Sequence, residues 1–297
     1  MVTLREHHPR GLEYLALVST LLHAARQAHP TACVWEAADL QWWWRRDQHS
    51  DAREQTFWFD GDRPVAAAVC MNWGDRIGCD VLTADPDDSA ALQIAWRHAA
   101  EHIDAHRDVP VEMTISDDNL ALVDAVAAAG FEPTDEVGVT TWMPAVERPR
   151  VPSPPAGFQL VARRDVPARS HPMIRRNGEL VAERLDECSL YRPELDLAVY
   201  DSEGEVAGYS LFWADPVTGV GLVEPMRTED RFQQMGVGRF LLAAGLDRLA
   251  AHGCSRLKVT YIVGNDAARR LYLGAGFHPE SRSRTYRRAA TDHAEPG

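Results

Sequence analysis

Apolar positions recur along the chain at two different spacings, and together these spacings predict an α/β protein. Leucine and valine return every three or four residues from 11 to 29, which is typical of an amphipathic helix. Short apolar runs on either side of Asp60-Gly61-Asp62 are typical of strands joined by a tight turn. Helices are expected at 11–29, 37–46, 86–105, 119–129, 167–188 with a break near Gly178, and from Phe240 onward. Strands are expected at 54–60, 63–71, 75–83, 109–115, 137–143, 157–164, 195–200, 206–213, 218–228 and 256–263, with a hairpin-like segment at 282–288.

Two segments of the chain repeat each other at a constant offset of 146 residues. The matched positions are Asn119 and Asn265, Ala121 and Ala267, the tripeptides ending at Phe131 and Phe277, and Pro133 and Pro279. A repeat of this length predicts two tandem halves with one fold. We expect domains at 1–146 and 157–290, joined by a proline-rich linker at 147–156. A polar tail at 291–297 is expected to be disordered.

Composition and charge narrow the class of protein. A chain of 297 residues that is 45% hydrophobic and 25% charged is ordinary for two soluble domains. A net charge of −13 argues against a nucleic-acid partner, and no apolar run is long enough for a membrane span. Five scattered cysteines favour reduced thiols, so we expect a cytoplasmic protein with no metal. The segment from His98 to His102 has a zinc-protease spacing, but its neighbours make it a polar helix face.

A glycine turn between a strand and a helix carries the clearest local chemistry. The apolar run 219–226 leads into Gly236 and Gly238, and a helical pattern begins at Phe240. Glycine lets backbone approach a ligand closely, and the first turn of a helix has N–H groups without intrahelical partners. Such a turn suits a phosphate or a pyrophosphate. The sequence lacks the Gly-Lys-Ser/Thr of a triphosphate loop and the third glycine of a dinucleotide loop.

The chain resembles the GNAT acyltransferase superfamily in two motifs. These are Gln233-x-x-Gly236-x-Gly238, like its pyrophosphate loop, and Asn265-x-x-Ala268-x-x-Leu271-Tyr272-x-x-x-Gly276-Phe277, like its second cofactor motif. The resemblance covers 157–287 and implies two tandem GNAT-like domains, each a mixed, mainly antiparallel sheet flanked by helices. The layout is similar to that of mycothiol synthase. The implied activity is acyl-CoA-dependent N-acyl transfer, most simply from acetyl-CoA to a small primary amine in a ternary complex.

The resemblance also implies where the acyl donor binds. Strands equivalent to 218–228 and 256–263 part in that family, and pantetheine pairs with the exposed backbone. Arg239 would add positive charge, although it could equally be a solvated helix residue, and Asn265 would serve as a helix N-cap as well. The expected cofactor-binding residues are Met226, Arg227, Thr228, Gln233, Gln234, Met235, Gly236, Val237, Gly238, Arg239 and Asn265.

Two residues are expected to carry the chemistry. The resemblance assigns Tyr272 to protonate the departing thiolate, and a phenol with a pKa of about 10 can donate a proton at pH 7. Glu224 is the candidate general base, since alternation places it on one strand face with Leu222 and Met226. The alternatives are that Tyr272 only packs under the sheet and that Glu224 forms a salt bridge with Arg227 or Arg231.

The first half lacks this chemistry. Its equivalent turn, 84–89, has no glycine, and three carboxylates there would cap the helix and repel an anionic cofactor. Val126 stands where the second half has Tyr272. We therefore expect the first half to be structural, or to form a wall of the substrate cleft. The tryptophans at 42–44 could form such a wall as well, although packing between the two domains is the favoured interpretation. The alternative function is a non-catalytic acyl-CoA-binding or regulatory module, and the chain is expected to be a monomer or a homodimer.

Overall fold

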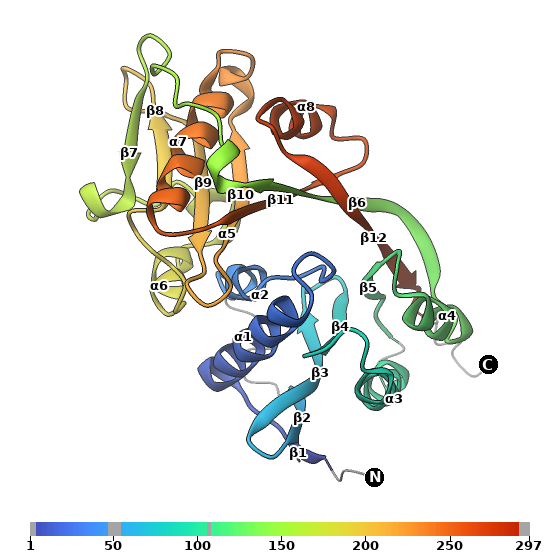
Figure 1. Ribbon diagram of the computed structural model, residues 1–297. Coiled ribbons are helices and arrows are strands. Elements are labelled where there is room, and N and C mark those ends of the chain that lie inside the picture. Colours follow the sequence, from blue (N-terminus) through green and yellow to red (C-terminus); the bar gives the residue numbers. More distant parts are fainter. Residues whose placement is uncertain (1–3, 47–54, 106–107, 291–297) are drawn as a thin grey trace, which may run out of the picture. The chain divides into compact units, whose positions relative to one another are not determined.

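The computed structural model describes residues 4–46, 55–105 and 108–290, which form two compact units (Figure 1). Unit 1 comprises the described parts of Met1–Leu40, Asp47–Val139 and Ser281–Gly297. Unit 2 comprises Gln41–Arg46 and Thr140–Glu280. The predicted tail at 291–297 lies outside the described residues. No helix in the described ranges is long and apolar enough to cross a membrane.

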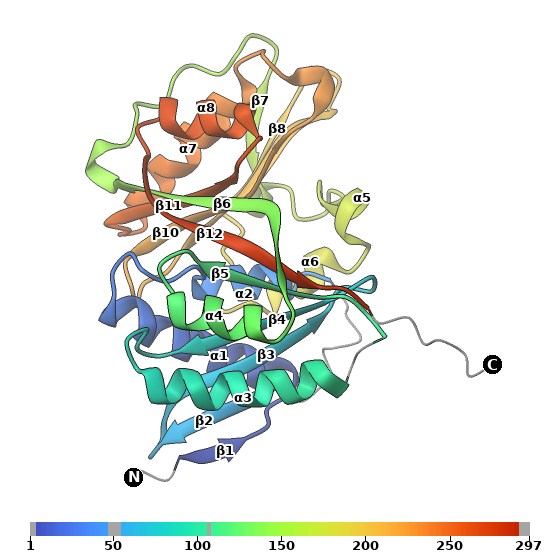
Figure 2. The ribbon, with the colours of Figure 1, turned by 90° about the vertical axis from the view of Figure 1, so that its right-hand side faces the viewer.

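Unit 1 is a sheet with helices on both of its faces (Figure 2). Its strands follow the order β1, β2, β3, β4, β5, β12, and only β4 and β5 are recorded as a parallel pair. Helix α3 buries a stripe of alanines (Ala91, Ala95 and Ala99) against β3 and β4, and α1 packs on the same strands. The elements are β1 (Arg5–His7), α1 (Gly11–Ala28), β2 (Thr56–Asp60), β3 (Arg63–Asn72), β4 (Ile77–Thr83), α3 (Ser89–Ala105), β5 (Val111–Ser116), α4 (Leu120–Ala128) and the start of β6 (Glu132–Pro144).

Unit 2 has the same architecture, with strand order β6, β11, β10, β9, β8, β7. Its helix α7 packs so closely on β9 that a Cβ at Gly245 would lie 1.9 Å from the Phe212 ring. The elements are α2 (Ala37–Trp43), β7 (Gln159–Ala162), α5 (Ile174–Asn177), α6 (Val181–Asp186), β8 (Asp196–Tyr200), β9 (Val206–Ala214), β10 (Val220–Thr228), α7 (Val237–Ala251), β11 (Arg256–Ile262), α8 (Asp266–Gly274) and β12 (His278–Arg288), with 3-10 turns at Ala145–Glu147, Arg163–Asp165 and Asp230–Phe232. Of these, α2 and β12 extend into unit 1.

The repeat found in the sequence is a structural repeat. Shifted by 146 residues, α8 coincides with α4 from its first residue to its last. Each helix begins in the same way, because Asn119 and Asn265 accept a hydrogen bond from the N–H three residues later, at 3.2 and 3.1 Å. The mixed α/β class and the tandem layout are confirmed.

The two compact units differ from the expected domains 1–146 and 157–290 in two segments, each of which belongs to the other unit. Gln41–Arg46 comes early in the chain but packs in unit 2, while residues from Ser281 onward belong to unit 1. There β12 pairs with β5 from Ser283 to Arg288 as one long strand, so the expectation of a hairpin at 282–288 is wrong. Long-range strand pairing of this kind leaves no local trace in a sequence.

Most other predicted elements are confirmed, with three further exceptions. The strand β1 was not expected, because three residues carry too little pattern. The helix expected over 167–188 is limited to α5 and α6, which Gly178 separates with a φ of +93°. In α2 the helix ends at Trp43, and Trp42 and Trp44 are both buried.

Candidate acetyl-transfer site

The strands β10 and β11 are paired only at their beginnings. Their parallel register joins Val220 to Arg256, Gly221 to Leu257 and Leu222 to Lys258, and no pairing is recorded beyond that point in the described residues. The outer edges of these strands are taken by β9 and β6. The facing edges after Leu222 are therefore left without a strand partner, which is the parting of strands that the resemblance implied.

A β-bulge interrupts β10 at Glu224 and Pro225. Leu222 lies opposite Trp213 and Met226 lies opposite Ser210, two partners an odd number of residues apart. Leu222 and Met226 consequently lie on opposite faces, so the prediction that both share a face with Glu224 is wrong. The Glu224 carbonyl accepts a hydrogen bond from Trp213 Nε1 at 2.6 Å, and the Pro225 carbonyl accepts one from Ser210 Oγ at 2.8 Å.

The glycine turn presents a row of backbone N–H groups at the start of α7. Gly236 has a φ of +82° and is the N-cap, with no side chain to occupy the helix end. Within the described part of the chain, no acceptor is recorded for the N–H groups of residues 234–239. A Cβ at Gly238 would lie 2.9 Å from Thr228 Oγ1, 3.7 Å from Leu271 Cδ2 and 3.9 Å from Met226 Cε. The turn, the end of β10 and α8 therefore meet at one place.

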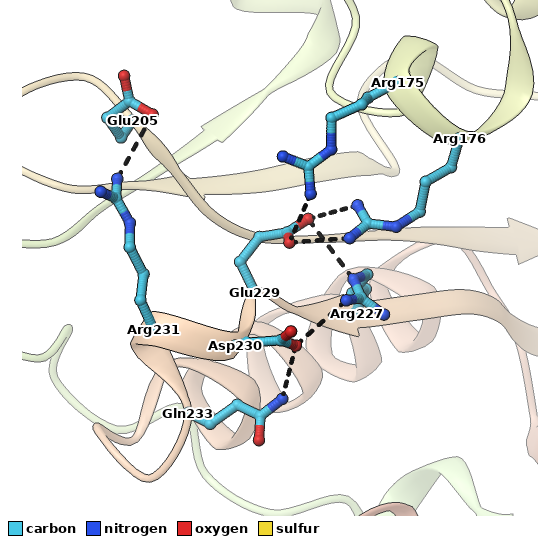
Figure 3. Close-up of polar contacts among 8 residues, drawn as sticks. All are labelled: Arg175, Arg176, Glu205, Arg227, Glu229, Asp230, Arg231 and Gln233. Atoms are coloured by element: carbon cyan, nitrogen blue, oxygen red, sulfur yellow. Dashed lines mark hydrogen bonds and ion pairs between the residues drawn. The ribbon is translucent and has the colours of Figure 1, made fainter.

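A network of charged side chains holds the end of β10 (Figure 3). Glu229 accepts hydrogen bonds from both Arg176 terminal nitrogens, at 2.7 and 3.0 Å, and these bonds lower the pKa of its carboxyl. Arg227 Nε lies 3.5 Å from Glu229, and its Nη2 donates to Asp230 at 3.2 Å. Asp230 also accepts a hydrogen bond from Gln233 Nε2 at 3.3 Å. The Gln233 side chain thus fixes the loop locally.

This network changes the interpretation of three residues. A salt bridge of Glu224 with Arg227 or Arg231 was the alternative to its role as a base, but the recorded ion pairs of Arg227 are with Glu229 and Asp230. Arg231 pairs instead with Glu205, at 3.4 Å (Figure 3). Asp230 accepts hydrogen bonds from its neighbours Arg227 and Gln233. Arg239 is exposed, and no ion pair is recorded for it in the described ranges.

Tyr272 is the buried residue of helix α8. Its side chain is 7% exposed, its ring packs edge-on against Phe277, and no hydrogen bond of its hydroxyl is recorded among the described residues. Burial raises the pKa of Tyr272 well above its ordinary value, and the charge of Glu224 raises it further. The phenol therefore stays protonated at neutral pH. Glu224 itself is half-buried.

Asn265 performs the N-cap role weighed in the sequence. Its Oδ1 accepts from Ala268 N, and the residue is exposed at the end of the strand gap. The exposed apolar side chains of Met235, Ile262 and Val263 lie at the glycine turn and at the end of β11. Single exposed apolar residues are common, so these carry no conclusion alone.

The segment Gln41–Arg46 supplies residues that no sequence motif indicated. Arg45 donates to Asn177 Oδ1 at 2.8 Å and stacks on the Trp42 ring at 4.0 Å. Burial lowers the pKa of Arg45 to about 10, Arg46 lowers it as well, and the charge of Glu224 opposes both. Trp44 Nε1 donates to Glu187 at 2.6 Å. The segment Gln41–Arg46 is thus in contact with the segment 167–192 within unit 2.

The described residues suit the chemical groups of an acyl-CoA. Unpaired N–H groups at a helix N-terminus suit a pyrophosphate. Unpaired strand edges suit the amides of pantetheine. Gly238 leaves room where a side chain would press on Thr228. These features are all within unit 2.

Comparison with known proteins agrees with this geometry. Residues 160–277 match the acetyltransferase (GNAT) family. No curated protein matches the chain. The fold is similar to a tandem GNAT protein from the clavulanic acid biosynthesis pathway, with a TM-score of 0.70, 17% identity, and coverage of 98% of this chain and 99% of that one.

Two further solved structures have the same fold. A GCN5-related N-acetyltransferase from Sphaerobacter thermophilus has a TM-score of 0.63 and 16% identity, covering 97% of this chain and 96% of that one. An acetyltransferase of the GNAT family from Colwellia psychrerythraea has a TM-score of 0.56 and 11% identity, covering 95% and 99%. At these identities the likeness establishes the fold.

Proposed function

On the premise that residues 160–277 belong to the acetyltransferase (GNAT) family, we propose that this chain transfers the acetyl group of acetyl-CoA to a small primary amine. The transfer is direct, with both substrates bound in unit 2. The chain uses one active half, and the first half is a supporting or ligand-binding partner.

One observation carries the proposal: the gap between β10 and β11 ends at a helix start whose N–H groups are unpaired. In the proposed complex, N–H groups of residues 234–239 bind the pyrophosphate. Backbone of Met226, Arg227 and Thr228 pairs with pantetheine, and an N–H there polarises the thioester carbonyl. Asn265, at the end of the same gap, completes the cofactor contacts.

Two side chains manage the protons. Acetyl-CoA supplies a reactive thioester: a C–N bond to the amine forms and the C–S bond breaks. Glu224 takes the proton that the amine nitrogen loses. Tyr272 gives its hydroxyl proton to the departing sulfur, and burial keeps that proton in place until it is needed. Because Glu224 accepts a proton and Tyr272 donates one, the carboxyl of Glu224 must be ionised at the same pH at which the phenol of Tyr272 is neutral.

The acceptor class follows from charge. Half-buried Glu224, on β10, favours a cationic amine over an anion. The names of the structural neighbours, which include N-acetyltransferases, agree with nitrogen as the acceptor atom. The competing function is a non-catalytic acyl-CoA-binding module, which would use the same backbone contacts and would need neither Tyr272 nor Glu224.

The test is release of free thiol from acetyl-CoA in the presence of a panel of primary amines. The wild type is expected to release thiol with at least one amine. Tyr272→Phe and Glu224→Gln are each expected to lower kcat by about a hundredfold or more, as loss of an acid or a base does. Tyr286→Phe, a buried tyrosine of unit 1, is the matched control. Acetyl-CoA binding without thiol release from any amine would favour the binding module.

A further inference from the structure

A cavity of about 480 Å³ lies within unit 1, where β4 and β5 part. Among the described residues these strands pair at Ile77 with Val111 and at Gly78 with Glu112 and no further, so unit 1 retains a strand gap like that of unit 2. Helix α1, the segment 32–35 and the beginnings of α3 and α4 complete its walls. A volume in this range accommodates a small organic molecule.

One buried carboxyl in this cavity has unused hydrogen-bonding capacity. Asp80, on β4, is 8% exposed and accepts a hydrogen bond from Trp35 Nε1 at 2.9 Å on Oδ1. Both residues line the cavity. Its second oxygen accepts no hydrogen bond from the described residues. This oxygen can accept a hydrogen bond from a ligand in the cavity, and a charged donor would form a strong one.

The charged residues around the cavity indicate whether that ligand is positively or negatively charged. The described residues that line it include three carboxylic acids, Asp80, Asp87 and Asp118, and one histidine, His29, but no lysine or arginine. The remaining walls are largely apolar, and Leu120 at the rim is 68% exposed. Such a cavity favours a molecule with an apolar body and a positive charge.

The phosphate position of a GNAT half is closed in unit 1. Asp88 Oδ1 accepts the N–H groups of Ala90 and Ala91, at 3.1 and 3.0 Å, and so caps α3. Asp85 and Asp87 add negative charge beside it, within 3.4 and 3.3 Å of the His29 ring. The anion of a CoA would meet carboxylates where unit 2 offers free N–H groups.

We propose that the cleft between β4 and β5 is a second binding site, specific for a small primary amine with an apolar body. The ammonium group donates to the free oxygen of Asp80, and the apolar body lies between α1 and β5. The site takes the amine class alone, without acyl-CoA, and it does not depend on acetyl transfer in unit 2.

The test is calorimetric titration of the full chain at pH 8, where Asp80 is ionised, with phenethylamine as the probe. Wild type is expected to bind the amine but not 3-phenylpropionate, an anion of the same size. Asp80→Asn should weaken amine binding at least tenfold. Asp62→Asn, an exposed turn residue, should leave this binding unchanged.

A second variant keeps the test valid if Asp80→Asn does not fold. Leu120→Arg places a positive charge on the exposed rim without burying anything, and it should weaken phenethylamine binding severalfold. Amine binding that survives both variants, or that is lost only in Glu224→Gln, would overturn the proposal. So would 3-phenylpropionate or acetyl-CoA binding that Asp80→Asn removes. If unit 2 released no thiol from acetyl-CoA, the proposed function would fail, but the amine titrations would still test the second site.

Discussion

Two buried acids of this protein, Tyr272 and Asp80, are held toward their neutral forms by the same cause. Each loses water around its ionised form when the chain folds, and burial raises the pKa of both. Tyr272 then remains a proton donor at any physiological pH. Asp80 has a pKa of about 7, despite a hydrogen bond from Trp35 that lowers it, so its charge changes near neutrality.

The pH dependence of stability follows for Asp80. Its pKa in the folded chain, about 7, exceeds that of the unfolded chain, about 4, so folding takes up a proton between these values. The stabilisation that this proton gives to the folded chain is fully present below pH 4. As pH rises to about 7, the free energy of unfolding falls by up to about 4 kcal/mol for this reason. Urea unfolding at pH 5 to 8 should show Asp80→Asn gaining stability relative to wild type as pH rises. The control Asp62→Asn should follow the wild type.

If the free energies of unfolding of Asp80→Asn and wild type changed in parallel with pH, the Asp80 carboxyl would already be ionised in the folded chain at pH 5. Trp35 donates a hydrogen bond to Asp80, and the Cys70 thiol on the paired strand β3 raises the pKa of Asp80. The thiols of Cys70 and Cys79 contact each other at 3.1 Å. This hydrogen bond and burial raise the pKa of Cys79, so that thiol remains neutral over this range.

Residue by residue, the sequence predicts those parts of the site that have local causes. Gly236 and Asn265 have the backbone roles that their types favour. The position of Glu224 could not be derived, because the bulge at Glu224 and Pro225 breaks the alternation on which the prediction depended. Asp80 and Arg45 were missed because their chemistry comes from burial by distant elements, which no short motif records.

At the scale of elements, helix α7 links the core to the glycine turn. Its buried residues occupy more than one stripe, because β9 and β10 cover one side and neighbouring elements the rest. Helices of this kind show little polar periodicity, so their ends are better predicted by glycine and capping residues than by pattern. The close approach at Gly245 sets how near the helix lies to Phe212 on β9.

Gly245→Ala tests this packing. Alanine normally favours a helix by about 1 kcal/mol over glycine, but here its Cβ would lie 1.9 Å from the Phe212 ring. We expect a net loss of unfolding free energy of about 1–3 kcal/mol, as overpacking produces. Gly274→Ala in α8, where nothing lies within 4 Å of the added atom, should be neutral or stabilising. Equal effects of the two variants in urea unfolding would contradict the packing described.

At the scale of the whole molecule, the chain is two copies of one fold with different sites. The repeat, the fold class and the loss of the first phosphate turn can all be predicted from sequence, since each has local markers. The exchange of Gln41–Arg46 and of residues after Ser281 cannot, because it depends on which distant strand or helix offers a better partner. Unit 1 has a gap between β4 and β5, but carboxylates lie at the start of its helix α3, where the helix start of unit 2 offers backbone N–H groups.

The central claim is that unit 2 alone binds the acyl donor. Its most direct test is calorimetric titration of the wild type and of Gly236→Asp with acetyl-CoA. Asp at this position brings a side chain into a left-handed backbone and a negative charge to the helix start. We expect one site per chain in the wild type and none in the variant. Two sites per chain, or binding unchanged by Gly236→Asp, would contradict the account.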